Sequence, residues 1–414
     1  MYRKVFFSAI LMFFLLTNFT FAAELEILSP SAILMDSNTG QVLYEKNSDE
    51  RLYPASTTKI MTALLLLEDG DLEKLVEINK DVPDLIERGS SQIYLIPGEL
   101  ITRKQLLFAL LIDSANDAAV AIAQDISGSV EKFARKMNKR ARELGATNTN
   151  FVNPHGLHDN NHYTSARDLA LIAREAMKNP IFREAVTTPR YIIPATNKQE
   201  TRYLYITNRL IRKTKNKNYY YEKATGIKTG YTSKSGYALV GGASDKNLDL
   251  ISVILNSTSS QVYEDTHALF EYGFNGFRPE IVINKGDVVK EISLNDNEDT
   301  VSVLAGESFE YLRLGDDKEN IIQKIDLPDK ISLPIEKNEV LGSLVLSLNG
   351  NEIGTIPLIS DKSLENSKFM STLLGKFSIL KSIGIVIILF LLYRTFIYIR
   401  KKKRRRKRMF YSKY

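Results

Sequence analysis

Residues 53–64 read Tyr-Pro-Ala-Ser-Thr-Thr-Lys-Ile-Met-Thr-Ala-Leu, and the apolar run that begins after Lys59 has the spacing of a helix. Because positions i and i+3 share one face of a helix, the Ser56 hydroxyl and the Lys59 amine can touch. A serine hydroxyl is a weak nucleophile at its ordinary pKa, so this pair is reactive only where the lysine accepts the serine proton. Burial and the positive partial charge of a helix N-terminus both disfavour the ammonium form, which favours Lys59 as that base.

Two further motifs follow along the chain. Ser114-Ala115-Asn116 comes directly after the strongly apolar helical stretch 106–112, and Lys228-Thr229-Gly230 opens a stretch that is typical of a strand. Taken one at a time, each has an ordinary alternative: a hydroxyl at a helix end, a helix cap or a solvated charge on a strand. Their order along the chain, together with the Ser56 motif, predicts one site to which all three contribute.

The three motifs resemble the S-x-x-K, S-D-N and K-T-G set of the penicillin-binding proteins and serine β-lactamases, with Ala115 at the variable position of the second motif. The flanking segments 153–157 (Asn-Pro-His-Gly-Leu), 163–170 and 225–232 narrow the resemblance to the low-molecular-mass penicillin-binding proteins that are serine-type D-alanyl-D-alanine carboxypeptidases. The resemblance covers about residues 32–274 and is looser beyond them.

This resemblance implies the catalytic roles. Ser56 would attack the carbonyl of a D-Ala-D-Ala peptide bond and form an acyl-enzyme, and Lys59 would take the serine proton. Ser114 would relay a proton to the leaving amine. The backbone N–H groups of Ser56 and Tyr231 would form the oxyanion hole.

The resemblance also implies how the substrate is held. Asn116 would bind the substrate backbone or Lys59, and Lys228 with the Thr229 hydroxyl would bind the free C-terminal carboxylate. Gly230 would let the substrate approach the strand edge, because a side chain there would block it. The substrate-binding set is therefore Asn116, Lys228, Thr229, Gly230 and Tyr231.

The expected reaction is removal of the terminal D-alanine from peptidoglycan stem pentapeptides, in cell wall biogenesis and cell shape, with β-lactam antibiotics as covalent inhibitors. One alternative is a β-lactamase, but the Glu-x-x-x-Asn pattern that positions the deacylating water in class A enzymes does not occur in the loop around residue 155. Another is a non-catalytic wall-binding or scaffold protein on the same fold. A transpeptidase is disfavoured, because we expect no large extra domain before Ser56.

Composition limits the remaining chemistry. The chain of 414 residues has no cysteine, which excludes cysteine nucleophiles and thiolate metal sites, and only four histidines. Three of them, His155, His158 and His162, are close enough in sequence to be considered as zinc ligands. The stretch is rich in turn residues and cannot form a regular helix. We therefore predict no metal and no cofactor, and expect His155 to pack beside the active site, as the resemblance implies.

Both ends of the chain carry membrane signals. Residues 1–22 combine a basic start, an apolar run and a small-residue exit, as in a secretory signal peptide. Residues 377–399 are apolar apart from Lys381 and Arg394, and nine consecutive basic residues follow from Arg400. This predicts one transmembrane anchor with a cytoplasmic tail, so that the catalytic body lies outside the cell membrane.

Two other interpretations of this C-terminal region are an amphipathic helix at the membrane surface and a nucleic-acid-binding arm. The first needs a polar face, which residues 382–393 do not have. The second is disfavoured because the basic run directly follows an apolar helix. The body between the leader and the tail is also net acidic, so no nucleic-acid partner is expected. The sequence carries no signal for the oligomeric state.

The predicted fold class is α/β: one antiparallel sheet built from both ends of the domain, with helices and a helical subdomain, followed by a small all-β domain and the transmembrane helix. The hairpin of residues 32–35 and 41–44, the helical middle 57–177 and the strands near 237–240 and 250–255 support this. Within the helical middle, Ser165 and Asp168 resemble a capping box. In the all-β domain, Asn349-Gly350 after alternating leucines predicts a hairpin. The predicted parts are a signal peptide (1–22), a catalytic domain (23–275), an all-β domain (276–360), a linker (361–376), an anchor (377–399) and a basic tail (400–414).

Overall fold

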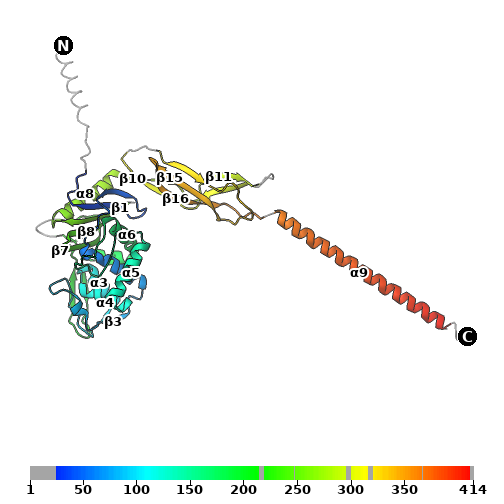
Figure 1. Cartoon of the computed structure of the whole chain (residues 1–414), viewed down its shortest axis with the longest axis horizontal. Helices are drawn as coiled ribbons and strands as arrows, with labels where there is room; N and C mark the ends of the chain where they lie inside the picture. The colour runs from blue at the N-terminus through cyan, green and yellow to red at the C-terminus, as the bar shows by residue number, and fades with distance from the viewer. Residues whose placement is uncertain are drawn as a thin grey trace, which may run out of the picture. The chain divides into compact units, whose positions relative to one another are not determined.

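The computed structural model describes residues 25–213, 219–246, 248–294, 300–315, 320–365 and 367–410, of which 367–379 and 405–410 are described by their backbone alone. The predicted signal peptide and the last four residues of the predicted tail lie outside the described residues. The chain divides into two units (Figure 1). Unit 1 is Met1–Glu280 with Tyr311–Asp317, and unit 2 is Ile281–Glu310 with Lys318–Tyr414.

Unit 1 is built around one antiparallel sheet. In spatial order its strands are β2 (Val42–Lys46), β1 (Ser31–Asp36), β9 (Leu248–Ser257), β8 (Gly236–Asp245) and β7 (Ala224–Thr232). The pairing of β1 with β2 confirms the predicted hairpin, and β8 and β9 are the predicted later strands. The two ends of the domain therefore share one sheet, as the sequence predicts, and β7 is left at its edge.

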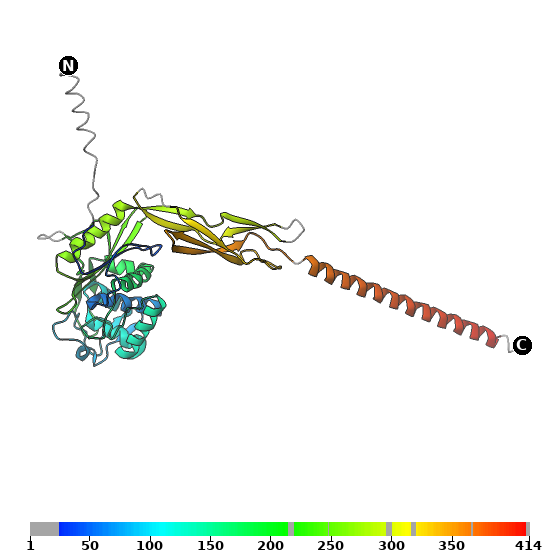
Figure 2. The same ribbon diagram turned by 45° about the horizontal axis from the view of Figure 1, so that its top comes forward.

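Both faces of the sheet are covered, because its strands are apolar on both sides. All six residues of β1 are buried. Since side chains alternate along a strand, Ile33 belongs to the core beneath the helical subdomain and Leu34 to the core beneath α8 (Gln261–Gly276). Figures 1 and 2 show α8 on one side of the sheet and α6 with the helical subdomain on the other.

Helix α2 (Lys59–Asp69) runs through the middle of the helical subdomain. Its residues from Lys59 to Leu66 are all buried, which is the pattern of a helix that is apolar all round and covered on every side. The helices packed against it confirm the predicted helical middle; they are α3 (Arg103–Ile112), α4 (Asn116–Ser127), α5 (Val130–Glu143), α6 (Ala166–Met177) and α7 (Pro180–Thr187). The N-terminus of α2 therefore lies inside the molecule.

Helix α6 begins as the sequence predicts, with one change of detail. The Ser165 hydroxyl accepts a hydrogen bond from the Asp168 backbone N–H at 3.2 Å, so Ser165 is the N-cap. The expected capping box is only half formed. The Asp168 carboxylate instead accepts from the Asn148 backbone N–H at 2.7 Å and the Thr149 hydroxyl at 2.6 Å, since this loop packs against the helix start.

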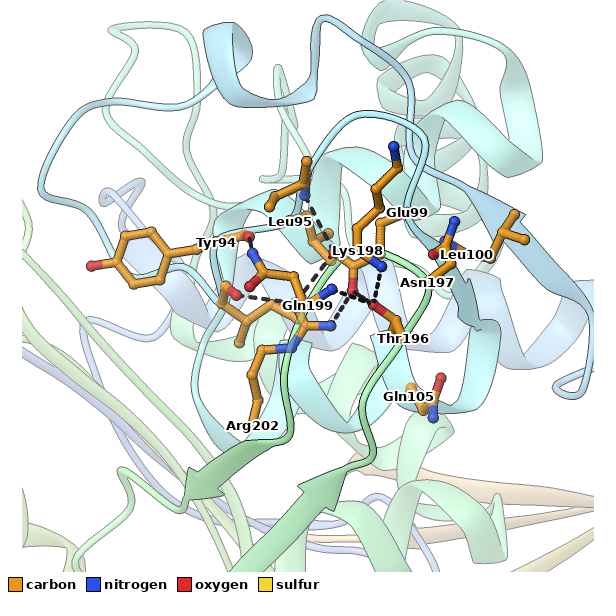
Figure 3. A network of polar contacts seen from close by, with 12 residues as sticks. Tyr94, Leu95, Glu99, Leu100, Gln105, Thr196, Asn197, Lys198, Gln199 and Arg202 are labelled. Carbon is orange, nitrogen blue, oxygen red and sulfur yellow. Dashed lines mark hydrogen bonds and ion pairs between the residues drawn. The ribbon is translucent and has the colours of Figure 1, made fainter.

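Polar contacts tie the loop of residues 93–100 to the connection between β5 (Arg190–Ile193) and β6 (Arg202–Tyr205), as Figure 3 shows. The fully buried Glu99 carboxylate is paired with Arg202 and accepts from the Thr196 hydroxyl at 3.0 Å. Arg202 also donates to the Ile93 carbonyl at 3.2 Å. The same network includes the short pair β3 (Leu75–Glu77) and β4 (Leu100–Thr102) through Leu100, whose N–H donates to Asn197 at 2.8 Å.

Unit 2 is all-β. Its five-stranded sheet has the order β11 (Val288–Ser293), β12 (Thr300–Ala305), β16 (Asn351–Ser360), β15 (Val340–Leu348) and β14 (Ile322–Asp326). Asn349 and Gly350 connect β15 to β16 with φ angles of 52° and 81°, which confirms the predicted Asn-Gly hairpin. The strands β10 (Phe277–Ile283) and β13 (Phe309–Leu314) pair with each other and continue from unit 1 into unit 2.

The C-terminal element is the single helix α9 (Ser367–Phe410). It begins within the stretch 361–376 that the sequence predicts to be a linker, and continues into the predicted tail, because no proline or glycine pair interrupts it there. Within it, Leu380–Arg404 is the one stretch of the described residues that is long and apolar enough to cross a membrane. The helix therefore fits the predicted anchor.

We predict that Glu99→Gln lowers the free energy of unfolding by about 3 kcal/mol, because the change leaves the Arg202 guanidinium, whose side chain is only 13% exposed, without its counter-charge. Glu175→Gln is the matched control. Glu175 pairs with Arg140 and Lys178 at the surface, so its loss should cost less than about 1 kcal/mol. Urea unfolding of residues 25–365, followed by circular dichroism, measures both values. Equal losses in the two variants would contradict the role given to the Glu99 pair.

Candidate active site

The predicted nucleophile and its predicted base lie at the start of the buried helix. Ser56 is in a short 3-10 turn, Ala55–Thr58, and Lys59 is the first residue of α2. Lys59 Nζ lies 2.9 Å from Ser56 Oγ, so the predicted pairing across one helical turn is present. Ala55, directly before Ser56, has φ of 49°, a left-handed backbone that an alanine rarely adopts. In this turn the Ser56 hydroxyl lies within hydrogen-bond distance of the lysine.

The Lys59 amine is held by two more oxygens. Asn116 Oδ1 lies 2.6 Å and the His155 carbonyl 2.7 Å from Lys59 Nζ, and the side chain is fully buried. Neither oxygen can donate a proton. A neutral amine has two N–H bonds and one lone pair. It can donate to these two oxygens and accept from the Ser56 hydroxyl, so all three contacts are satisfied when Lys59 is neutral.

Electrostatics favour that neutral form. Burial lowers the pKa of Lys59 well below its usual value, and the nearby Lys228 cation lowers it further. Asp117 acts in the opposite sense, but its own carboxylate is buried and accepts backbone hydrogen bonds from Ile93 and Leu95. Burial is the larger effect, so Lys59 is suited to accept a proton near neutral pH.

Ser114 and Asn116 come from the connection between α3 and α4. Ser114 has φ of 61°, and the backbone turns there so that Asn116 can begin α4 beside Lys59. Two backbone hydrogen bonds hold the turn, from Ala115 N to Ala109 O at 3.2 Å and from Asn116 N to Ser91 O at 2.8 Å. The structure thus brings both residues of the second motif to the site, Asn116 against Lys59 and Ser114 against the third motif.

Lys228 and Thr229 come from the edge strand β7. Lys228 Nζ donates to Ser114 Oγ at 3.0 Å and to the Thr229 carbonyl at 3.1 Å. Burial lowers the pKa of Lys228, while the Asp113 carboxylate opposes that shift. An ammonium group has a third N–H in addition to these two contacts. Because β7 is the sheet edge, that proton and the Thr229 hydroxyl can meet an anion next to the strand.

Gly230 has a second reason, in addition to the one that the sequence suggested. A Cβ at this position would lie 3.0 Å from the Pro54 carbonyl and 3.1 Å from Ser56 N. The glycine therefore lets β7 pack against the turn that carries Ser56, in addition to leaving the strand edge open. Tyr231 follows, 56% exposed, with its ring 4.4 Å from that of Tyr237.

The histidine-rich loop supports the site through hydrogen bonds. The His155 side chain is buried, as expected beside the active site, and its Nδ1 accepts from the Leu157 N–H at 3.1 Å. His162 Nδ1 accepts from Val152 N at 3.0 Å, and its Nε2 lies 2.9 Å from the Thr58 hydroxyl. Burial lowers the pKa of His155 to about 3 and of His162 to about 4, so both rings are neutral. No metal-binding cluster occurs among the described residues.

Sequence reasoning did not find two parts of this site. One is the His155 carbonyl, because a backbone oxygen carries no signal in the residue type. The other is Gly156, with φ of 86°, where a Cβ would lie 1.8 Å from the Ala55 carbonyl. The conformation and the close approach both require glycine. The Asn-Pro-His-Gly-Leu segment contained a signal for it, but only the structure shows that Gly156 touches the turn of Ser56.

Comparisons with known proteins agree with this geometry. The D-alanyl-D-alanine carboxypeptidase family matches residues 18–259, and the C-terminal domain of penicillin-binding protein 5 matches residues 277–366. The chain is 36% identical to the D-alanyl-D-alanine carboxypeptidase DacF of Bacillus subtilis, over 85% of this chain and 90% of the relative. It is 32% identical to DacC of Escherichia coli, over 86% and 90%.

Solved structures give the same result. Penicillin-binding protein 5 from Haemophilus influenzae superimposes with a TM-score of 0.70 at 27% identity, and the match covers 82% of this chain and 98% of that one. A mutant of the Streptomyces K15 DD-transpeptidase superimposes with a TM-score of 0.56 at 33% identity, over 60% and 99%. The predicted α/β fold with a C-terminal β domain is therefore confirmed.

We predict that Gly156→Ala lowers the rate of acylation by a fluorescent penicillin at least 100-fold, because the new Cβ must displace the Ser56 turn. Gly128→Ala is the matched control. Gly128 has φ of 75° but no atom within 4 Å of its Cβ position. Its loss should cost about 1 kcal/mol of stability and leave acylation within twofold. If the two variants acylate at the same rate, Gly156 has no role in placing Ser56.

Proposed function

The chain belongs to the D-alanyl-D-alanine carboxypeptidase family and is therefore a peptidase, and on this premise we propose that Ser56 cleaves the terminal D-alanine from peptidoglycan stem pentapeptides. The observation that carries the proposal is the position of the Lys59 amine, buried between Ser56 Oγ, Asn116 Oδ1 and the His155 carbonyl. A positioned base next to a serine is the requirement for acyl transfer at neutral pH.

In the proposed acylation, the Ser56 hydroxyl transfers its proton to the Lys59 lone pair while Oγ attacks the carbonyl of the penultimate D-alanine. The developing oxyanion accepts hydrogen bonds from the Ser56 and Tyr231 backbone N–H groups. The C–N bond then breaks, and the nitrogen of the leaving D-alanine takes a proton. Ser114 supplies the path for that proton, because its hydroxyl accepts from Lys228 and keeps its own O–H for donation.

In the proposed deacylation, water attacks the Ser56 ester, and Lys59 again serves as the base. The products are the shortened stem peptide and the restored Ser56 hydroxyl. A β-lactam enters the same acylation step, but its ring-opened acyl group stays on the serine. For that reason β-lactams are proposed as covalent inhibitors and not as substrates of rapid turnover.

The free carboxylate of the substrate is proposed to bind Lys228 and Thr229. Lys228 is almost fully buried and lies against Ser114, so a carboxylate at the edge of β7 would meet a cation with little competing water. The proposal requires a neutral Lys59 and a charged Lys228. Burial lowers the pKa of both amines, that of Lys228 to about 7, and a bound carboxylate favours the Lys228 cation. Asn116 holds Lys59 and can offer its amide N–H to the substrate backbone.

Two other functions remain as alternatives with distinct outcomes. One similar solved structure is a Streptomyces K15 DD-transpeptidase, whose acyl-enzyme would pass to an amine and not to water. A wall-binding protein without catalysis is the second. The carboxypeptidase is preferred because curated relatives that share most of the chain's length carry that activity in their names.

We predict that the full chain in detergent is labelled stably by a fluorescent penicillin and releases D-alanine from a peptide ending in D-Ala-D-Ala. Ser56→Ala and Lys59→Ala should each lower both activities at least 1,000-fold, because the nucleophile or its base is lost. Labelling without D-alanine release would support the transpeptidase or wall-binding alternative. Rapid turnover of penicillin would indicate a β-lactamase, and absence of labelling would refute the acyl-enzyme.

We also propose that α9 is a single transmembrane anchor, with the catalytic unit outside and the basic end in the cytoplasm. The support is the span Leu380–Arg404 followed by consecutive lysines and arginines, which favour the cytoplasmic side. A peripheral amphipathic helix is the alternative.

The chain has no cysteine, so a cysteine introduced by mutation is its only thiol. Its reaction with a thiol reagent therefore shows on which side of the membrane that residue lies. We predict that Ser363→Cys reacts with a membrane-impermeant maleimide in spheroplasts that retain an intact membrane, whereas Ser412→Cys reacts only after the membrane is opened. Reaction of both cysteines before opening would favour a helix that lies on the membrane surface.

A further inference from the structure

Thr207 lies beside the proposed carboxylate site and belongs to none of the three motifs. Its hydroxyl oxygen is 3.2 Å from the Thr229 hydroxyl oxygen, and the side chain is exposed. Thr207 follows β6, whereas Thr229 belongs to β7. The sequence analysis gave this residue no role, because a single threonine in a connection carries no signal.

The backbone around Thr207 is fixed from three sides. Its N–H donates to the Ile112 carbonyl at 3.2 Å, at the end of the helix that leads to Ser114. The neighbouring Ile206 is buried and donates its own N–H to the Pro189 carbonyl at 3.0 Å. Asn208, on the other side, is also buried. The Thr207 hydroxyl is therefore presented to Thr229 from a backbone that hydrogen bonds and buried neighbours hold in place.

The proton count of the two hydroxyls limits how they can act. Each hydroxyl has one proton to donate and can accept further hydrogen bonds. Within the part of the chain that the structure describes, neither hydroxyl has another hydrogen-bond partner. When a carboxylate binds Thr229, the Thr229 proton is used for that carboxylate. The contact between the two threonines then requires the proton of Thr207.

We propose that Thr207 is a positioning residue: its hydroxyl donates to Thr229 Oγ1 and so directs the Thr229 proton toward the C-terminal carboxylate of the substrate. A hydroxyl that accepts a hydrogen bond is also the better donor, because the bonds polarise each other. Thr207 thereby contributes to the selection of peptides with a free carboxylate. The inference rests on the proposed function, in which Lys228 and Thr229 bind that group.

The test compares two substrates, a peptide ending in D-Ala-D-Ala and the same peptide with its C-terminal carboxylate converted to an amide. Four variants of the full chain in detergent are needed: Thr207→Val, Thr207→Ser, Thr229→Val and the double Thr207→Val/Thr229→Val. Valine keeps the shape of threonine and removes the hydroxyl, whereas serine keeps the hydroxyl. Thermal unfolding of each variant checks that the fold is retained.

We expect Thr207→Val to lower kcat/KM for the free-acid peptide about five- to tenfold, as for the loss of one hydrogen bond, mainly through a higher KM. The ratio of kcat/KM for the acid over the amide should fall by a similar factor. Thr207→Ser should restore the ratio. In the Thr229→Val background, removal of the Thr207 hydroxyl should have no further effect, because the group through which it acts is already absent.

A fall of equal size with the acid and the amide, or in both backgrounds, would overturn the inference, because a purely structural role predicts that result. Failure of serine to restore the ratio would overturn it as well. If Thr229→Val itself leaves the acid-to-amide ratio unchanged, the carboxylate site of the proposed function is wrong and the inference fails with it. A changed ratio in Thr229→Val together with an unchanged ratio in Thr207→Val refutes the role of Thr207 alone.

Discussion

The contact of the Lys59 amine with three oxygens is the interaction on which the rest of the site depends. A lysine that acts as a base must lose its proton near neutral pH, and burial is the largest cause that lowers the pKa of Lys59. The fold provides that burial by placing the N-terminus of α2 inside the helical subdomain, with its first eight residues covered. The three oxygens also fit the neutral amine, which can donate its two N–H bonds to Asn116 Oδ1 and the His155 carbonyl. Ser56 is the one partner of the three that can donate to the lone pair.

The need to bring several segments into contact around the buried Lys59 amine also explains the unusual backbone of the site. Ala55 and Ser114 both have positive φ, and each would cost about 1 kcal/mol or more in an unconstrained chain. Gly156 and Gly230 remove side chains where three segments meet at the Ser56 turn. Such positions persist only where surrounding contacts determine them, and they concentrate at sites of catalysis. The buried pair of Glu99 and Arg202 and the Asp117 carboxylate hold the loop of residues 93–100, whose neighbour Ser91 in turn supports the start of α4. Contacts in the surrounding fold therefore offset the free-energy cost of these strained backbone positions.

Much of this arrangement could be predicted from local patterns. The hairpin of β1 and β2, the helices from 57 to 177 and the Asn-Gly turn of unit 2 each follow from residue periodicity or turn chemistry over short stretches. The start of α9 at Ser367 and the half-formed capping box at Ser165 could not be predicted, since both depend on which of several acceptable local structures the neighbours favour. The reason for Gly230 was only partly predicted, because the segment it touches is about 170 residues away along the chain.

The sequence by itself determined which residue types are available and in what order: a serine three positions before a lysine, a Ser-Ala-Asn motif, a Lys-Thr-Gly motif and an apolar C-terminal segment before a basic run. These are properties of adjacent residues, so periodicity and motif spacing reveal them. The tertiary structure alone decided that Lys59 is fully buried, that Lys228 donates to Ser114, that the His155 carbonyl contacts Lys59, and that the Thr207 hydroxyl contacts Thr229. Those facts depend on distances between segments that are far apart in the chain, and on desolvation, which exists only once the core has formed.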